Sequence, residues 1–164
     1  MKHMLFILAF VVFFAPQRAE ALLCTPILGC TCTVTASDID FGDFTPFAGL
    51  QDAIGQIEVD CTGVIDVAPS VSTRLDDGLW GNFTARKMRT AIGGNELSYN
   101  IYTTSQRNVV LGDGTGGSVT TSISGGLITL GHWQRSTTIF ARATPTVTTR
   151  PGEYSDTVVV RIVW

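Results

Sequence analysis

The stretch QIEVDCT at residues 56–62 decides the fold class, because its apolar and polar residues alternate one by one. Ile57, Val59 and Cys61 fall on one face of an extended chain, and the two acids between them fall on the other. This two-residue period predicts a strand with one buried face and one solvated face.

Similar β-rich runs recur along the chain, and turn residues separate them. None of them shows a sustained apolar period of 3.6 residues, so the whole pattern predicts an all-β sandwich. The further runs are Val64–Ser72, Leu97–Thr103, Val119–Ser124, Leu127–His132, Thr137–Ala143 and Asp156–Trp164. The turn signals are Asp77-Gly78, Gly93-Gly94-Asn95, Gly112–Gly117, Gly125-Gly126 and Pro151-Gly152.

The last of these runs is the most apolar. One face carries Val158, Val160, Ile162 and Trp164, and the opposite face is interrupted only by Arg161. Such a strand is apolar enough to be covered on both sides.

The first 21 residues have the anatomy of a secretory signal peptide. Lys2 precedes an apolar run from Met4 to Ala15, and small residues flank the expected cleavage point after Ala21. The apolar run is shorter than the roughly 20 residues that a membrane-spanning helix needs. We therefore expect export, no stable membrane span, and a mature chain that begins at residue 22.

Composition narrows the class of the exported chain. The 164 residues are 45% hydrophobic and 15% charged, with a formal net charge of −3. This length suits one domain with a real core, and the low charge argues against intrinsic disorder. The acidic balance argues against a nucleic-acid binder, which works by neutralising phosphates.

The four cysteines are Cys24, Cys30, Cys32 and Cys61. In an exported chain, an even number favours disulfides over metal ligands, and the spacing does not match a zinc site. Three pairings are open, and the one between Cys30 and Cys32 is the least favourable because a strand cannot close it. A bridge from Cys32 to Cys61 would close a loop of about 30 residues and stabilise the fold by roughly 3–4 kcal/mol. Cys24 and Cys30 would then staple the N-terminus.

Catalytic and cofactor motifs are weak throughout. His132 is the one histidine of the predicted mature chain, and it stands in a strand-like run without a nucleophile motif. The acidic segment Asp38–Asp43 lacks the spacing of a calcium loop and is interpreted as an edge strand with a solvated face. The loop Gly112–Gly117 lacks the residues of a phosphate site and is interpreted as a hairpin loop. The sequence predicts no enzyme, cofactor or metal.

Together, several segments resemble the spore coat protein U family, whose domains form secreted subunits of archaic chaperone–usher pili and related coats. The resemblance spans nearly the whole mature chain, in order. It rests on Cys32–Ala36 leading to Phe41-Gly42 and Pro46, on Gly55–Thr62, on Arg86-Lys87-Met88, on Leu97–Tyr102 continuing to Gly112–Thr115, and on Pro151–Val158 running to Trp164.

This resemblance implies an immunoglobulin-like sandwich over residues 32–164 that lacks its final strand. A neighbouring subunit would fill the resulting groove by strand addition, after a periplasmic chaperone and an outer-membrane usher had acted on the chain. It also implies a disulfide between Cys32 and Cys61. The C-terminal strand, with Val158, Val160, Ile162 and Trp164, would line the groove, and the subunit would pass through the periplasm to the cell surface.

The N-terminal extension, residues 22–31, departs from the pilin pattern because it is short. Leu23, Ile27 and Leu28 would be its groove-filling residues as a donor segment. A bridge between Cys24 and Cys30 would bend it, and the subunit would then accept a strand without donating one.

Two functions stay open at this stage. The first is a structural pilus or fimbrial subunit that supports adhesion and biofilm formation. The second is a self-contained coat or binding protein that recognises a ligand through loops such as Asp77–Gly81 or Gly112–Gly117. A small secreted enzyme has no residue in its favour.

Overall fold

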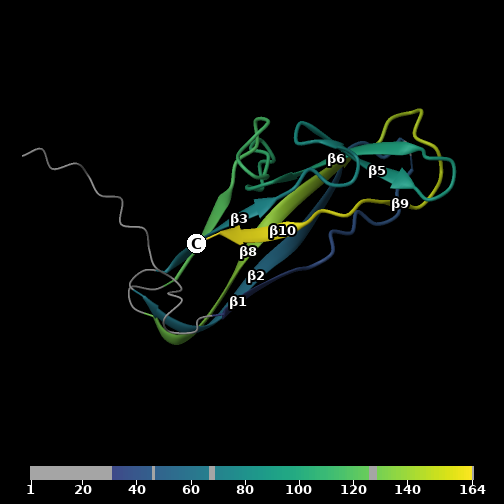
Figure 1. The fold of residues 1–164 in the computed structure, drawn as a ribbon. Coiled ribbons are helices and arrows are strands. Elements are labelled where there is room, and N and C mark those ends of the chain that lie inside the picture. The colour runs from purple at the N-terminus through teal and green to yellow at the C-terminus, as the bar shows by residue number, and fades with distance from the viewer. Residues whose placement is uncertain (1–30, 46, 67–68, 126–128, 164) are drawn as a thin grey trace, which may run out of the picture.

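The computed structural model describes residues 31–45, 47–66, 69–125 and 129–163, and these ranges contain strands and loops but no helix (Figure 1). The predicted all-β class is therefore confirmed. The strands are β1 (Thr31–Ala36), β2 (Gln51–Asp66), β3 (Ser70–Leu75), β4 (Gly81–Asn82), β5 (Ala85–Thr90), β6 (Glu96–Tyr102), β7 (Thr121–Ser124), β8 (Thr129–Thr144), β9 (Tyr154–Ser155) and β10 (Val160–Val163).

The strands form two sheets that face each other. The larger sheet has the order β1-β2-β8-β6-β5-β4, and β9 adds to β5. The smaller sheet has the order β10-β3-β7. The long strands β2 and β8 pair antiparallel and run through the length of the molecule, with a bulge between Cys61 and Val64 (Figure 1). The architecture is the predicted immunoglobulin-like sandwich.

The core lies between the sheets, where the predicted alternation places the apolar side chains. Ile57, Val59 and Cys61 are fully buried, while the intervening acids of β2 are not. From β6, Leu97 and Ile101 are buried in the same way. The smaller sheet and β8 complete the core cluster, with Val71 and Leu75 of β3, Ile123 of β7, and Trp133 and Ile139 of β8. Burial of about 25 cal/mol per Å² of apolar surface is the main stabilising force here.

Several of the predicted runs have different bounds in the structure. Val64–Ser72 is not one strand, because β2 ends at Asp66 and β3 begins at Ser70. Leu127–His132 and Thr137–Ala143 belong to one continuous strand, β8. The C-terminal run Asp156–Trp164 is longer than the strand found, because β10 covers Val160–Val163 and pairs with β3 in the smaller sheet. β9 lies just before that run and pairs with β5 in the larger sheet. The end of the chain therefore crosses from one sheet to the other.

Two loop predictions are wrong. Asp38–Asp43 is not an edge strand, because the chain turns where the Asp40 carboxylate accepts the Gly42 N–H at 2.8 Å. Gly112–Gly117 is not a simple hairpin loop, because it joins a strand of the larger sheet to one of the smaller sheet. Its ends are instead held by a parallel bridge between Leu111 and Val119.

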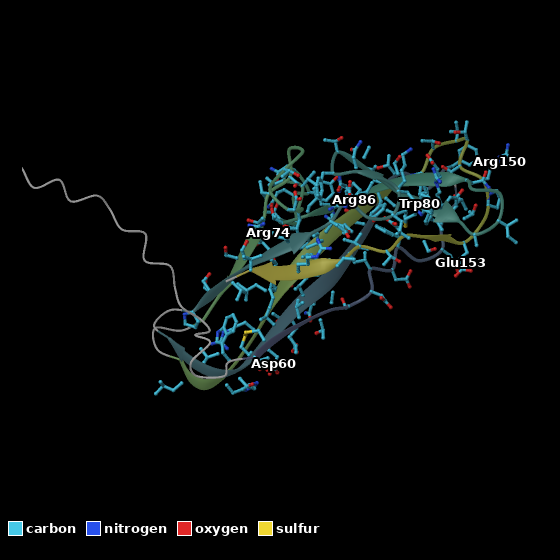
Figure 2. The ribbon with its side chains drawn as sticks, in the orientation of Figure 1. Asp60, Arg74, Trp80, Arg86, Arg150 and Glu153 are labelled. Carbon is cyan, nitrogen blue, oxygen red and sulfur yellow. A yellow bond between two sulfur atoms is a disulfide. The ribbon has the colours of Figure 1, made fainter. Side chains whose placement is uncertain are left out.

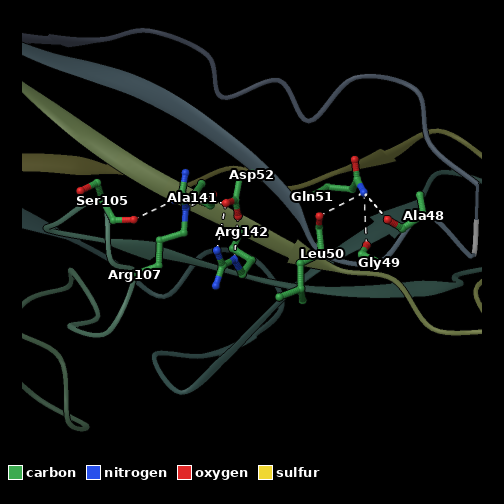
Figure 3. A network of polar contacts seen from close by, with 9 residues as sticks. All are labelled: Ala48, Gly49, Leu50, Gln51, Asp52, Ser105, Arg107, Ala141 and Arg142. Carbon is green, nitrogen blue, oxygen red and sulfur yellow. Dashed lines mark hydrogen bonds and ion pairs between the residues drawn. The ribbon is translucent and has the colours of Figure 1, made fainter.

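A polar network fastens the loop after β6 to the larger sheet (Figure 3). The Asp52 carboxylate accepts two hydrogen bonds from Arg142, at 2.6 and 2.9 Å, and lies 3.2 Å from Arg107. Arg107 also donates to the Ala141 carbonyl at 3.0 Å. The hydrogen bonds from Arg142 lower the pKa of the Asp52 carboxyl, so the pair is charged at neutral pH.

Several predictions concern residues outside the described ranges. They are the signal peptide, the donor residues Leu23, Ile27 and Leu28, the cysteines Cys24 and Cys30, and Trp164. Within the described residues, the structure has no helix of the length and apolarity that a membrane crossing requires.

Candidate functional site

The first and last strands meet at an open edge of the sandwich, which we call the β1/β10 edge. In the described part of the chain, β1 pairs only with β2, and β10 pairs only with β3. The two strands nevertheless lie close to each other. Among the described residues, β10 therefore presents a row of backbone N–H and C=O groups that no strand pairs, and it does so beside β1, itself an outer strand of the larger sheet. Such a row is the usual template for adding another strand.

The side chains at the β1/β10 edge are apolar and incompletely covered. Val34 of β1 and Val160 and Ile162 of β10 are half-buried and pack against the core, as does Val158 just before β10. Val59, which is opposite Val34 on the neighbouring strand β2, has no exposed surface. An extended segment with alternating apolar residues would gain burial here without meeting a charged side chain of β1, whose sequence is TCTVTA.

A disulfide holds β1 in place. Cys32 and Cys61 are opposite each other in the antiparallel register of β1 and β2, and their sulfur atoms are bonded. This confirms the pairing that the family resemblance implied. The bond fixes β1, the outer strand of the larger sheet, to its neighbour β2.

The start of β10 is fixed by a reciprocal contact with the loop after β3. The Val159 N–H donates to the Asp76 carboxylate at 2.9 Å, and the Asp76 N–H donates to the Val159 carbonyl at 3.1 Å. The same carboxylate accepts the Gly78 N–H at 3.1 Å. These bonds set the register of β10 against β3, so the strand is ordered although one of its sides is open.

A second carboxylate fixes the segment just before β10. Asp156 accepts the Tyr99 hydroxyl at 2.6 Å and the Leu79 N–H at 2.9 Å. Burial, together with this bond, raises the pKa of Tyr99 above its usual value, so the hydroxyl stays a donor. Tyr99 of the larger sheet thereby fixes the point at which the chain crosses to the smaller sheet.

A buried arginine supports the first of these contacts, the one made by Asp76, and its role was not predicted from the sequence. Arg86 has no exposed surface and lies between the sheets (Figure 2). Its guanidinium donates to the Asn100 side chain at 2.6 Å and to the carbonyls of Asp76 and Leu111 at 2.7 and 3.0 Å. Burial lowers its pKa. The bond to Asp76 links the core to the loop that positions β10.

The histidine that was considered for catalysis lies on the solvated face. His132 contacts the Asp60 carboxylate at 3.0 Å, and both side chains are substantially exposed. Among the described residues, no group of three or more metal-ligating side chains comes together.

A shallow hollow of about 370 Å³ lies away from the β1/β10 edge. It is lined by Leu79 and Trp80 of the loop before β4, and by Arg89, Thr90 and Ser155 among others. Trp80 lies toward the end of the molecule opposite Asp60 (Figure 2). Arg89 stacks on the Trp80 ring at 4.2 Å. Two residues of the loop Asp77–Gly81, for which ligand binding stays a prediction, thus line this hollow.

Comparison with known proteins gives a family and a fold. The family described as Spore Coat Protein U domain matches residues 19–161. A complex of the chaperone CsuC with the tip adhesion subunit CsuE, from archaic chaperone–usher Csu pili of Acinetobacter baumannii, aligns with 22% identity and a TM-score of 0.56. The alignment covers 82% of this chain and 40% of the matched chain, so the chain spans well under half of that relative.

A second solved structure has a similar length. The P pilus rod subunit PapA aligns with 14% identity and a TM-score of 0.50, over 80% of this chain and 97% of that chain. At these identities the likeness shows the fold alone, an immunoglobulin-like sandwich shared with pilus subunits. No curated protein sequence matches the chain.

Proposed function

The chain belongs to the spore coat protein U domain family, and from this premise we propose that it is a structural subunit of a chaperone–usher pilus or surface coat. The observation that carries the proposal is the β1/β10 edge, where β10 has an unpaired side next to β1 within the described residues. A donor strand from a periplasmic chaperone, and later from a neighbouring subunit, would add there.

The chemistry of the edge supports strand addition rather than ligand binding by side chains. Val158, Val160 and Ile162 offer apolar contacts at every second position, which an alternating donor segment would match. Backbone hydrogen bonds along β10 would supply affinity for many sequences. The function is thus structural rather than enzymatic, with adhesion and biofilm formation as its outcomes.

Export belongs to the same proposal. A signal peptide at residues 1–21 would direct the chain to the periplasm, where the chaperone binds, and the usher would carry it to the cell surface. The extension at residues 22–31 would act as donor through Leu23, Ile27 and Leu28. If Cys24 and Cys30 are bridged, the subunit would instead accept a strand only.

Co-production of the full chain with the periplasmic chaperone encoded beside its gene tests the proposal. We expect a stable complex in which the amides of residues 160–163 exchange with solvent at least tenfold more slowly than in the free chain, because a new ladder protects them. Arg161→Glu, on the exposed side of β10, serves as the matched control for Val160→Asp, which should abolish the complex. A free chain that is monomeric and stable, and whose exchange the chaperone leaves unchanged, would contradict the proposal.

One observation favours a second function, that of a self-contained binding protein. The hollow beside Trp80 combines an aromatic ring with hydroxyl groups and a guanidinium, which suits a small polar ligand. Under this alternative the isolated chain would be stable without any chaperone. The same co-production experiment therefore separates the two functions.

A further inference from the structure

The sandwich has a second open edge, formed by β7 and the first part of β8, which we call the β7/β8 edge. β6 pairs with β8 only from Phe140 to Thr144. Between Thr129 and Ile139, β8 has β2 on one side and, in the described part of the chain, no strand on the other. Among the described strands, β7 pairs with β3 alone, and it lies near β8. By backbone geometry alone, this edge offers the same kind of template as the β1/β10 edge.

Side-chain direction distinguishes the two edges. Trp133 and Ile139 of β8 are buried, 2% and 3% exposed, so positions 133, 135, 137 and 139 face the interior. Arg135 occupies one of these inward positions and is opposite the fully buried Val59. It is nevertheless an exposed residue. Its charged group therefore lies at the opening of the sandwich, at a position that the pattern assigns to an apolar residue.

The charge of Arg135 is not neutralised by a carboxylate. The guanidinium donates to the carbonyl of its neighbour Gln134 at 2.8 Å, and none of the ion pairs formed by the described residues includes it. A strand added along this part of β8 would cover the guanidinium and separate it from water. Burying an unpaired charge is costly, whereas burying Val160 or Ile162 at the other edge is favourable.

We propose that Arg135 determines which edge receives a strand, because it keeps the β7/β8 edge closed to strand addition and leaves the β1/β10 edge as the acceptor. Inward-pointing charges protect edge strands of natural sheets from pairing. Without the charge, the edge would present Trp133, Thr137 and Ile139 without a break. This inference rests on the proposed function, since it names the residue that gives strand addition its place.

The test compares Arg135→Val with Ser136→Val in the full chain. Both changes add the same β-branched residue to β8, but residue 136 points outward, opposite Glu58. Light scattering over a concentration series measures self-association, and hydrogen exchange locates it. We expect Arg135→Val to self-associate at a concentration at least about tenfold lower than the wild type does. The substitution removes the free-energy cost of burying the charge, and that cost corresponds to more than about a tenfold change in the association constant. Amides 129–139 should become protected, and Ser136→Val should match the wild type.

Two further variants keep the outcome decisive. Arg135→Lys retains the charge and should match the wild type, while Arg135→Gln removes it with little loss of volume, and serves if the valine variant does not fold. If Arg135→Val and Arg135→Gln self-associated at the same concentration as the Ser136→Val control, the proposed role of Arg135 would be overturned. Hydrogen exchange at residues 160–163 tests the proposed function, and exchange at residues 129–139 tests the role of Arg135. The two results are therefore independent of each other.

Discussion

Replacing Cys61 with serine should lower the free energy of unfolding, because it removes the disulfide that holds the edge strand β1. The bond to Cys32 closes a chain segment with a sequence separation of 29. In the chain-entropy estimate, this constraint on the unfolded state stabilises the fold by about 3.6 kcal/mol. Cys61 is also fully buried, so a serine hydroxyl without a partner there would cost a further ~1–2 kcal/mol.

Guanidinium unfolding of the full chain under oxidising conditions measures this loss, which we expect to total about 5 kcal/mol. Trp133 is opposite Cys61 in the register of β2 and β8, so its fluorescence reports on the affected region. Reduction of a Cys24→Ser, Cys30→Ser variant, which keeps the Cys32–Cys61 bridge, should cost only this cross-link, about 3.6 kcal/mol. The difference between reduction and substitution then isolates the buried hydroxyl.

The double variant Cys24→Ser, Cys30→Ser is the matched control, because it leaves the link between β1 and β2 intact. It should change the free energy of unfolding by less than about 1 kcal/mol. If Cys61→Ser also remained within about 1 kcal/mol of the wild type, the cross-link would contribute little, and the entropy argument would be refuted.

Three further predictions follow from the core and the β1/β10 edge. Val160→Asp should reduce assembly into a complex or polymer at least tenfold, because strand addition would bury an unpaired charge, whereas equal yields of Val160→Asp and Arg161→Glu would show that this face is not covered. Arg86→Gln should lower the free energy of unfolding by about 2–4 kcal/mol, since the Asp76 and Leu111 carbonyls lose a charged donor; a denaturation midpoint equal to that of the wild type would contradict it. Because the pKa of Tyr99 is raised in the folded state, the unfolded chain loses its proton first, and stability should fall by up to about 1.4 kcal/mol per pH unit above pH ~10. Chemical denaturation at a series of alkaline pH values measures this slope. The slope should be absent from the Tyr99→Phe variant, which has no hydroxyl to titrate at this position.

Local alternation was sufficient to predict the buried faces of several strands. The face with Ile57, Val59 and Cys61 was correct because those residues contact the core through a regular pleat, and Leu97 and Ile101 follow the same rule. Such a face depends only on neighbours two positions apart along the chain. It is therefore readable from one sequence.

The role of Arg86 was not readable in this way. Its three partners, Asn100, Asp76 and Leu111, come from separate segments that meet only after folding. The one local signal is that Arg86 shares the inward face of β5 with Met88. The short strand β9 and the crossing from it to β10 were not predicted for a related reason, because Asp156 fixes that crossing through Tyr99, a residue distant in sequence.

The two open edges of the sandwich have the same unpaired backbone but opposite side-chain chemistry. At β10, the bonds between Asp76 and Val159 order the strand from its start, and its inward residues are apolar. An incoming segment would therefore meet a preformed strand and pay less ordering entropy for pairing with it. At β8, the strand is ordered by β2, but the inward Arg135 would have to be buried. Two features thus restrict strand addition to one edge. The bonds to Asp76 hold the acceptor strand β10 in place, and the charge of Arg135 on β8 disfavours addition at the other edge.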